Sequence, residues 1–264
     1  MLKDLIEFVG AVLYRLSTFA VKRGHCRTVL YYHGIKEGDI ACFKQQMQYL
    51  VANFLVVSPL AIRTACGDGQ KSIVAITFDD AFENLIENAV PVLKEMNLPV
   101  GIFVPVSNLG QLPQWSISSD CADGTEKVMT TEQISQLDRD GFEIFSHAVS
   151  HGDLTKLDDE RLLSELRESK RILESMVGHE VEGISYPHGE HNDCVCDAAR
   201  ECGYKMGFTI EPKRVTDKSD NFKIGRFAVS PRDSMPVFKL KANGAYEVVY
   251  YLRRIKSYLN ITKK

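Results

Sequence analysis

Two short segments of the chain concentrate residue types that could carry chemistry. Residues 72–80 read S-I-V-A-I-T-F-D-D, so an apolar run ends in the adjacent carboxylates Asp79 and Asp80. About seventy residues later, His147 and His151 stand four positions apart in S-H-A-V-S-H-G-D. Two imidazoles and one carboxylate form a facial metal site that keeps positions open for water and substrate. The second carboxylate would remain free to act as a base.

The apolar run before the two carboxylates is typical of a buried β-strand, and α/β folds place their active sites at the C-terminal ends of such strands. A helix N-cap would explain one Asp well but two adjacent ones poorly. Because side chains alternate along a strand, one carboxylate could bind metal while the other faces an attacking water. If the histidine segment forms a helical turn, its two imidazoles lie about 5–6 Å apart at Cβ and, with Asp80, complete a ligand set.

The composition is that of an ordinary soluble globular protein. The chain has 264 residues, of which 44% are hydrophobic and 25% charged, and its net charge of −3 gives no reason to expect a nucleic acid partner. Its seven cysteines are scattered, odd in number and without a C-x-x-C pair. This pattern favours reduced thiols in a cytosolic protein.

The first two dozen residues predict an amphipathic helix. Apolar residues recur there at helical spacing: Leu2, Leu5, Ile6, Val9, Val12, Leu13, Leu16, Phe19 and Ala20. Five charged residues between Lys3 and Lys22 interrupt the run, which is therefore too short and too charged to span a bilayer. No uninterrupted apolar core or small-residue cleavage site indicates a signal peptide. The helix would either pack on the domain or lie in a membrane interface, and its place before the first core strand favours the membrane.

The rest of the chain alternates strand and helix patterns. Strands are expected at 28–32, 73–76, 100–104, 142–145, 184–186, 206–210 and 223–227, and helices at 43–53, 85–96, 131–137, 158–177 and 246–259. This alternation favours parallel strands with helices outside, whose ends converge on one rim as in a (β/α) barrel. Without a repeat or linker, the chain divides into an N-terminal helix, residues 1–24, and a single domain, residues 25–264.

Two further segments bring polar groups to that rim. His33 ends the first strand and could line the same site. Pro187, His188 and Gly189 form a turn signal in Y-P-H-G-E-H-N. Such a turn can direct backbone N–H groups toward an oxyanion.

Arg226 and Trp115 complete the candidates. Arg226 lies at the end of a strand, where it could hold Asp79 in the ionised state or form a structural ion pair. Trp115 is the only tryptophan and lies in the long connection 107–128. An aromatic face there could stack on a sugar ring, although a single tryptophan in a long loop is as often packing.

The motifs T-F-D-D, S-H-x-x-x-H and Y-P-H-G, in this order, resemble the polysaccharide deacetylase family with NodB homology, a carbohydrate esterase type. The resemblance covers about residues 28–233, and L-Y-Y-H-G-I at 30–35 looks like the opening strand of members that act in glycan assembly. It implies a distorted (β/α)7 barrel that removes acetyl groups from sugars. Matched motif by motif, Asp79 is the general base, and Asp80, His147 and His151 bind a divalent ion, usually Zn2+, with Co2+, Ni2+ or Mn2+ as alternatives.

The chain departs from the family pattern in its third motif and beyond. The family usually supplies its general acid as a histidine near the C-terminus, but no histidine follows His191. The third motif's arginine is replaced by Ser185 and its tyrosine by His188, whose backbone N–H matches the oxyanion position. We expect Arg226 to stand in for that arginine. For the acid, the candidates are His33, His188 or metal-bound water alone, and we favour His33.

Together these features predict a hydrolase of carbon–nitrogen bonds other than peptide bonds: a metal-dependent deacetylase of an N-acetylated sugar, oligosaccharide or polyprenyl-linked glycan intermediate. It would work in the cytoplasm or peripherally on the inner face of the membrane. The alternatives are a non-catalytic sugar-binding barrel and a hydrolase of another amide. Asp79 argues against the first, because a metal site for binding alone needs only Asp80 and the histidines.

Overall fold

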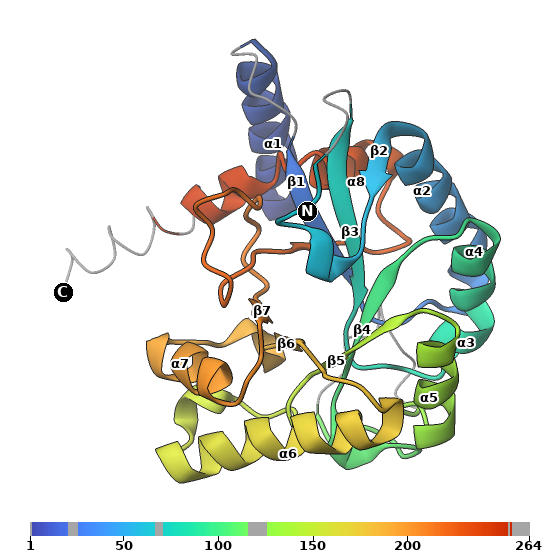
Figure 1. The fold of residues 1–264 in the computed structure, drawn as a ribbon. Helices are drawn as coiled ribbons and strands as arrows, with labels where there is room; N and C mark the ends of the chain where they lie inside the picture. The colour runs from blue at the N-terminus through green and yellow to red at the C-terminus, as the bar shows by residue number, and fades with distance from the viewer. Residues whose placement is uncertain (1, 21–25, 67–70, 116–125, 253, 255–264) are drawn as a thin grey trace.

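A computed structural model describes residues 2–20, 26–66, 71–115, 126–252 and 254. Its strands are β1 (Arg27–Tyr32), β2 (Phe54–Val56), β3 (Ser72–Phe78), β4 (Val100–Val104), β5 (Glu143–Ser146), β6 (Gly183–Ser185), β7 (Met206–Phe208) and β8 (Phe227–Ala228). They form one curled sheet in the order β7-β6-β5-β4-β3-β1-β8, while β2 pairs with β3 beside this path (Figure 1). Each of these pairings is parallel.

The segment around β8 brings the two ends of the sheet together. Ile224 forms a parallel bridge with Phe208 on β7, and Phe227 pairs with Leu30 on β1. The sheet is thereby nearly closed into a ring of seven strands, with only short pairings at the seam. The prediction of a distorted (β/α)7 barrel is confirmed.

Alternation along β3 decides which side chains face the barrel interior. Ile73 and Ala75 belong to an inner cluster with Phe103, Phe145 and Phe208. The alternate residues Val74 and Ile76 pack outward against the helices. Thr77 and Asp79 follow Ala75 at the same two-residue spacing, so β3 delivers Asp79 on the interior side.

The sheet is surrounded by helices: α1 (Leu2–Ala20), α2 (Ile40–Asn53), α3 (Asn84–Asn88), α4 (Val90–Glu95), α5 (Thr131–Arg139), α6 (Asp159–Val177), α7 (Asp193–Glu201) and α8 (Met235–Ala242). Helix α5 begins with a capping box, in which the side chains of Thr130 and Gln133 accept hydrogen bonds from each other's backbone N–H. Helix α6 is capped by the Asp158 carboxylate and ends at Gly178, whose φ of 78° suits glycine. These caps confirm the helices expected near 131–137 and 158–177.

Some expected elements are shorter or broken. The helix expected over 85–96 divides at Ala89 into α3 and α4, because Pro91 has no N–H and fits only the first turn of a helix. The strand expected over 223–227 is limited to Phe227–Ala228. In the tail, residues 247–252 are helical, and most of the remaining predicted helix, including 255–259, lies outside the described residues. Elements β2, α7 and α8 were not expected.

The predicted N-terminal helix is present as α1, which lies beside α8 (Figure 1). Tyr14 of α1 donates a hydrogen bond to Glu247 at 2.8 Å. Whether residues 1–24 are separable from the domain stays a prediction. Among the described residues, no helix is both long and apolar enough to cross a membrane.

Candidate active site

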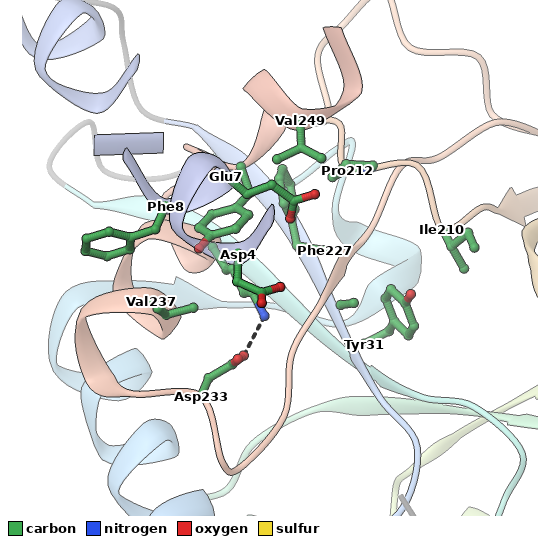
Figure 2. Close-up of a pocket in the computed structure, with 13 residues that line it drawn as sticks. Asp4, Glu7, Phe8, Tyr31, Ile210, Pro212, Phe227, Asp233, Val237 and Val249 are labelled. Atoms are coloured by element: carbon green, nitrogen blue, oxygen red, sulfur yellow. Dashed lines mark hydrogen bonds and ion pairs between the residues drawn. The ribbon is translucent and has the colours of Figure 1, made fainter. Parts of the chain in front are cut away.

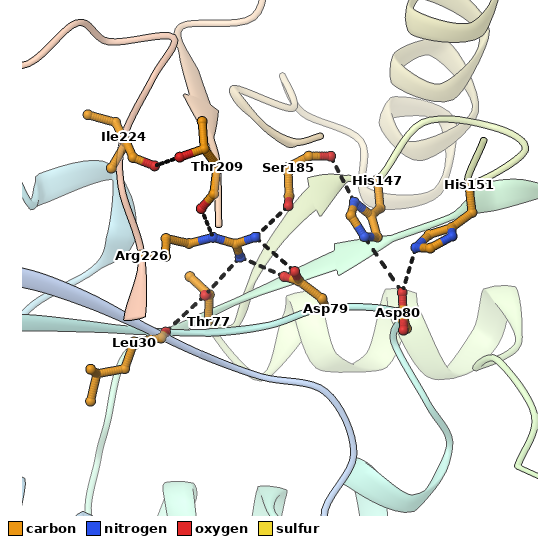
Figure 3. Close-up of polar contacts among 10 residues, drawn as sticks. All are labelled: Leu30, Thr77, Asp79, Asp80, His147, His151, Ser185, Thr209, Ile224 and Arg226. Carbon is orange, nitrogen blue, oxygen red and sulfur yellow. Dashed lines mark hydrogen bonds and ion pairs between the residues drawn. The ribbon is translucent and has the colours of Figure 1, made fainter. Parts of the chain in front are cut away.

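Asp80, His147 and His151 meet at the C-terminal ends of β3 and β5. Each offers a ligand atom within 4.8 Å of the others, and all three side chains are buried. Nε2 of His151 lies 3.0 Å from Oδ1 of Asp80, and Nε2 of His147 lies 3.6 Å from the same oxygen (Figure 3). Within the described residues, His151 Nδ1 is buried without a hydrogen-bond partner, and Asp80 Oδ1 is buried with only the two imidazole nitrogens beside it. Unsatisfied buried atoms are costly, and this donor set fits a divalent ion that would satisfy them.

The protonation states also suit a metal ion. Burial raises the pKa of Asp80, but the neighbouring His151, His33 and His147 together bring it to about 2. Burial lowers the pKa of His147 to about 4. Nδ1 of His147 donates a hydrogen bond to the Ser185 carbonyl at 2.7 Å, which leaves the Nε2 lone pair facing Asp80. At neutral pH the cluster therefore contains a charged carboxylate and a neutral, oriented imidazole.

The segment that carries the two histidines is a loop, so the helical turn considered from their spacing is wrong. The chain turns through Ala148 and His151, whose φ angles of 62° and 57° lie in the left-handed region. A carboxylate oxygen of Glu165 on α6 accepts hydrogen bonds from the backbone N–H groups of Val149 and Ser150, both at 3.0 Å. Sequence reasoning did not identify Glu165, because nothing in the pattern of α6 distinguishes it from the other acidic residues there.

Asp79 is held by Arg226 in a bidentate ion pair. The two guanidinium nitrogens lie 2.6 and 2.8 Å from the two carboxylate oxygens (Figure 3). The other three N–H groups of Arg226 donate to the Thr209 carbonyl at 3.0 Å, Thr77 Oγ1 at 3.2 Å and Ser185 Oγ at 2.7 Å. All five donors of a fully buried guanidinium are therefore used. The structure brings together the two residues that the sequence only suggested as partners.

This ion pair determines the charge of Asp79. Burial raises the pKa of the Asp79 carboxyl, but the charge and hydrogen bonds of Arg226, together with His147 and His33, outweigh burial and hold the pKa below its usual value. The rings of Tyr31 and Phe103 cover the guanidinium, with centroids 4.6 and 5.1 Å from its central carbon. Asp79 is thus an ionised carboxylate with a fixed orientation.

His33, His188 and Trp115 lie around the metal cluster. His33 follows β1 and is half-buried, and its charge lowers the pKa of both Asp79 and Asp80, which places it on their rim. Trp115 stacks on His151 with ring centroids 4.3 Å apart. The His188 ring meets His151 edge-on at 4.7 Å. One face of Trp115 is therefore covered by a candidate metal ligand.

The turn Pro187–Gly189 follows β6 at the same rim. His188 adopts a left-handed conformation with φ of 58°, and Gly189 follows with φ of 74°. A Cβ on Gly189 would lie 2.2 Å from Ile210, so the position requires glycine. The His188 ring is exposed and lies against the buried His151 ring.

A cavity of about 420 Å³ lies to one side of this site, between α1, α8 and residues 210–212 (Figure 2). None of the three candidate metal ligands lines it. Tyr31 lines the cavity and also covers Arg226, so its ring lies between the cavity and the buried guanidinium. Asp4 and Glu7 of α1 line the opposite wall.

Comparison with known sequences identifies the family. The profile described as polysaccharide deacetylase matches residues 67–207, more than half of the chain. The chain belongs to the polysaccharide deacetylase family. The match includes the three candidate metal ligands, Asp79 and the 187–189 turn, whereas His33 and Arg226 lie outside it.

Relatives and solved structures agree with this assignment. The poly-beta-1,6-N-acetyl-D-glucosamine N-deacetylase of Staphylococcus epidermidis is 27% identical over 200 residues, which cover 71% of this chain and 66% of that enzyme. A Streptococcus pyogenes deacetylase solved in complex with acetate has a TM-score of 0.67 at 21% identity, covering 83% of this chain and 99% of its own. A Bacillus cereus polysaccharide deacetylase has a TM-score of 0.65 at 22% identity, covering 84% and 69%. The structural likeness supports the shared barrel.

Proposed function

We propose that the protein is a divalent-metal-dependent deacetylase of an N-acetylated glycan. One observation carries the proposal: a buried, ionised carboxylate, Asp79, is fixed by Arg226 beside the cluster of Asp80, His147 and His151. A metal site used only for binding would not require the separate carboxylate and its five-donor arginine. A base next to a metal site is the arrangement that amide hydrolysis needs.

Asp80, His147 and His151 would hold the ion, and zinc suits their nitrogen and oxygen donors, as do cobalt, nickel and manganese. When bound, a divalent ion supplies Lewis acidity that polarises the acetamide carbonyl and acidifies a water molecule. The hydrogen bond from His147 Nδ1 to the Ser185 carbonyl leaves Nε2 as the ring nitrogen that would bind the ion.

Proton movements fall to Asp79 and His33. Asp79 accepts the proton of the attacking water, and Arg226 keeps the carboxylate ionised and correctly oriented for this step. His33 lies on the same rim and would donate a proton to the leaving amine. With His33 in this role, the enzyme does not need a histidine near the C-terminus.

The turn after β6 and Trp115 would act on the substrate. The backbone N–H of His188, with Pro187 and Gly189 holding the turn, would stabilise the oxyanion that forms at the acetyl carbonyl. Trp115 covers one face of His151 and would exclude water from that side. Its sugar-stacking role is thereby limited to the edge and the opposite face of the indole.

The substrate to try first is a β-1,6-linked N-acetylglucosamine oligomer, because the staphylococcal relative is named for that polymer. A polyprenyl-diphosphate N-acetylglucosamine is the second candidate. Acetate release would be measured on both, with stripped protein and with Zn2+ or Co2+ added back. Metal-dependent acetate from either substrate supports the proposal. Metal binding without acetate from either would favour a sugar-binding barrel or a hydrolase of another amide.

A further inference from the structure

Helix α1 has its polar face toward the protein and its apolar face toward solvent. Glu7, Ala11 and Tyr14 recur at spacings of four and three, so they lie on one face of the helix. Ala11 is fully buried, and Glu7 lines the cavity between α1 and α8 (Figure 2). This inward face is therefore held by polar contacts as well as by packing.

The polar contacts of Tyr14 show how this orientation is fixed. Tyr14 donates to Glu247 at 2.8 Å and accepts a hydrogen bond from Arg214 at 2.9 Å. Arg214 in turn donates to the same Glu247 oxygen at 2.8 Å. Glu247 is only 6% exposed, so rotation of α1 about its axis would deprive a buried carboxylate of its hydrogen bond from Tyr14.

The opposite face of α1 is apolar and uncovered. Val9, Leu13 and Leu16 follow the same four-and-three spacing, offset by about half a turn, and are 47%, 62% and 62% exposed. We call these three residues the apolar face of α1. The helical residues 247–252 lie alongside and end in Tyr251 and Leu252, which are 48% and 44% exposed. A surface helix of a soluble domain ordinarily has the reverse arrangement, with its apolar stripe inward.

Charge indicates what covers this face. Residues 1–25 and 246–264 together contain nine Lys and Arg but three Asp and Glu, although the whole chain carries a net charge of −3. Of those three acids, Asp4 and Glu7 line the cavity between α1 and α8, and Glu247 is buried. A second copy of this surface would bring like charges together, whereas an anionic lipid surface would attract them.

We propose that the apolar face of α1 docks on an anionic lipid bilayer, with the helix lying in the interface. Apolar side chains at spacings of four and three enter the acyl boundary together, and the excess of Lys and Arg in residues 1–25 and 246–264 adds electrostatic attraction to anionic headgroups. The inference does not depend on the deacetylase activity.

The test is sedimentation of the full chain with vesicles of phosphatidylcholine alone and with about 30 mol% phosphatidylglycerol added. The L13S/L16S variant is compared with V51S/L55S, which changes two apolar side chains that are also exposed but lie on α2 and β2. We expect binding to the anionic vesicles, a loss of about tenfold or more in partitioning for L13S/L16S, and wild-type binding for the control. Added salt should weaken binding to the anionic vesicles.

Equal sedimentation of L13S/L16S and wild type, or no binding to anionic vesicles, would overturn the proposal. So would a dimer in analytical ultracentrifugation that L13S/L16S dissociates, because a second copy would then cover the face. Acetate release from a soluble oligomer is measured on the same samples. Retained release shows that L13S/L16S is folded, so a loss of vesicle binding is separable from a loss of the proposed activity.

Discussion

Replacing Arg226 by Met should reveal how strongly the fold depends on the ion pair with Asp79. The substitution keeps much of the side-chain volume but removes five hydrogen-bond donors and the charge that faces Asp79. Asp79 is 3% exposed, so its carboxylate would be left buried without a partner. Breaking a buried pair in this way typically costs about 3–5 kcal/mol of unfolding free energy.

The cost should depend on pH. In the wild type the pKa of Asp79 is lowered in the folded state, so the pair contributes stability above the unfolded pKa of about 4 that is lost as pH falls through the lower folded pKa. In R226M, burial without a partner raises the folded pKa above the unfolded one. The folded variant then binds a proton that the unfolded chain lacks, so its stability falls as pH rises. The loss relative to wild type should be larger at pH 7 than at pH 5.

Urea unfolding with chelator in every sample measures this difference without a contribution from metal. The double variant D79N/R226M removes both charges and should recover part of the loss. The control R214M breaks a less buried pair, with Glu247, and its loss should vary less between the two pH values. A loss below about 1 kcal/mol for R226M, equal at both pH values, would refute the reasoning.

Three further predictions concern the loop, the acid and the metal. E165Q should weaken Zn2+ affinity about 10- to 100-fold in a competition titration, because the Glu165 carboxylate holds the loop between the two histidines. The control E168Q, on the same helix, should keep the wild-type affinity, and equal affinities for the two variants would contradict this role of Glu165. H33Q should lower the rate of acetate release about 10²- to 10⁴-fold and abolish the alkaline limb of its pH–rate profile. The control H179Q should leave the rate and the profile unchanged, and an unaltered pH profile for H33Q would exclude the acid role. Adding Zn2+ at about 100 times its Kd to stripped protein should raise the free energy of unfolding by about 2.7 kcal/mol, measured by thermal unfolding. D80N should lose most of this stabilisation, and an equal stabilisation of D80N would place the ion elsewhere.

The candidate metal ligands and the candidate base could be proposed from the sequence because the evidence for them is local. Asp79 and Asp80 end a recognisable strand, and His147 and His151 share one short loop. The conformation of the loop could not be predicted, since its backbone at Val149 and Ser150 is held by Glu165 of α6, which is distant in sequence.

The surroundings of Asp79 were harder to predict. Arg226 lies 147 positions away from Asp79 along the chain, and only the folded barrel brings the two side chains together. Thr77 could have been found from strand alternation, since it lies two residues before Asp79. Thr209 contributes a backbone carbonyl, which side-chain patterns do not reveal. The amphipathic pattern of the first residues predicted a helix but not which of its faces would pack on the domain.

The most direct test of the central claim measures bound metal and released acetate on the same preparations of wild type, D79N and D80N. The account predicts about one equivalent of metal and acetate release for the wild type, the same metal without release for D79N, and loss of both for D80N. Acetate release by D79N at the wild-type rate, or full metal retention by D80N, would contradict it.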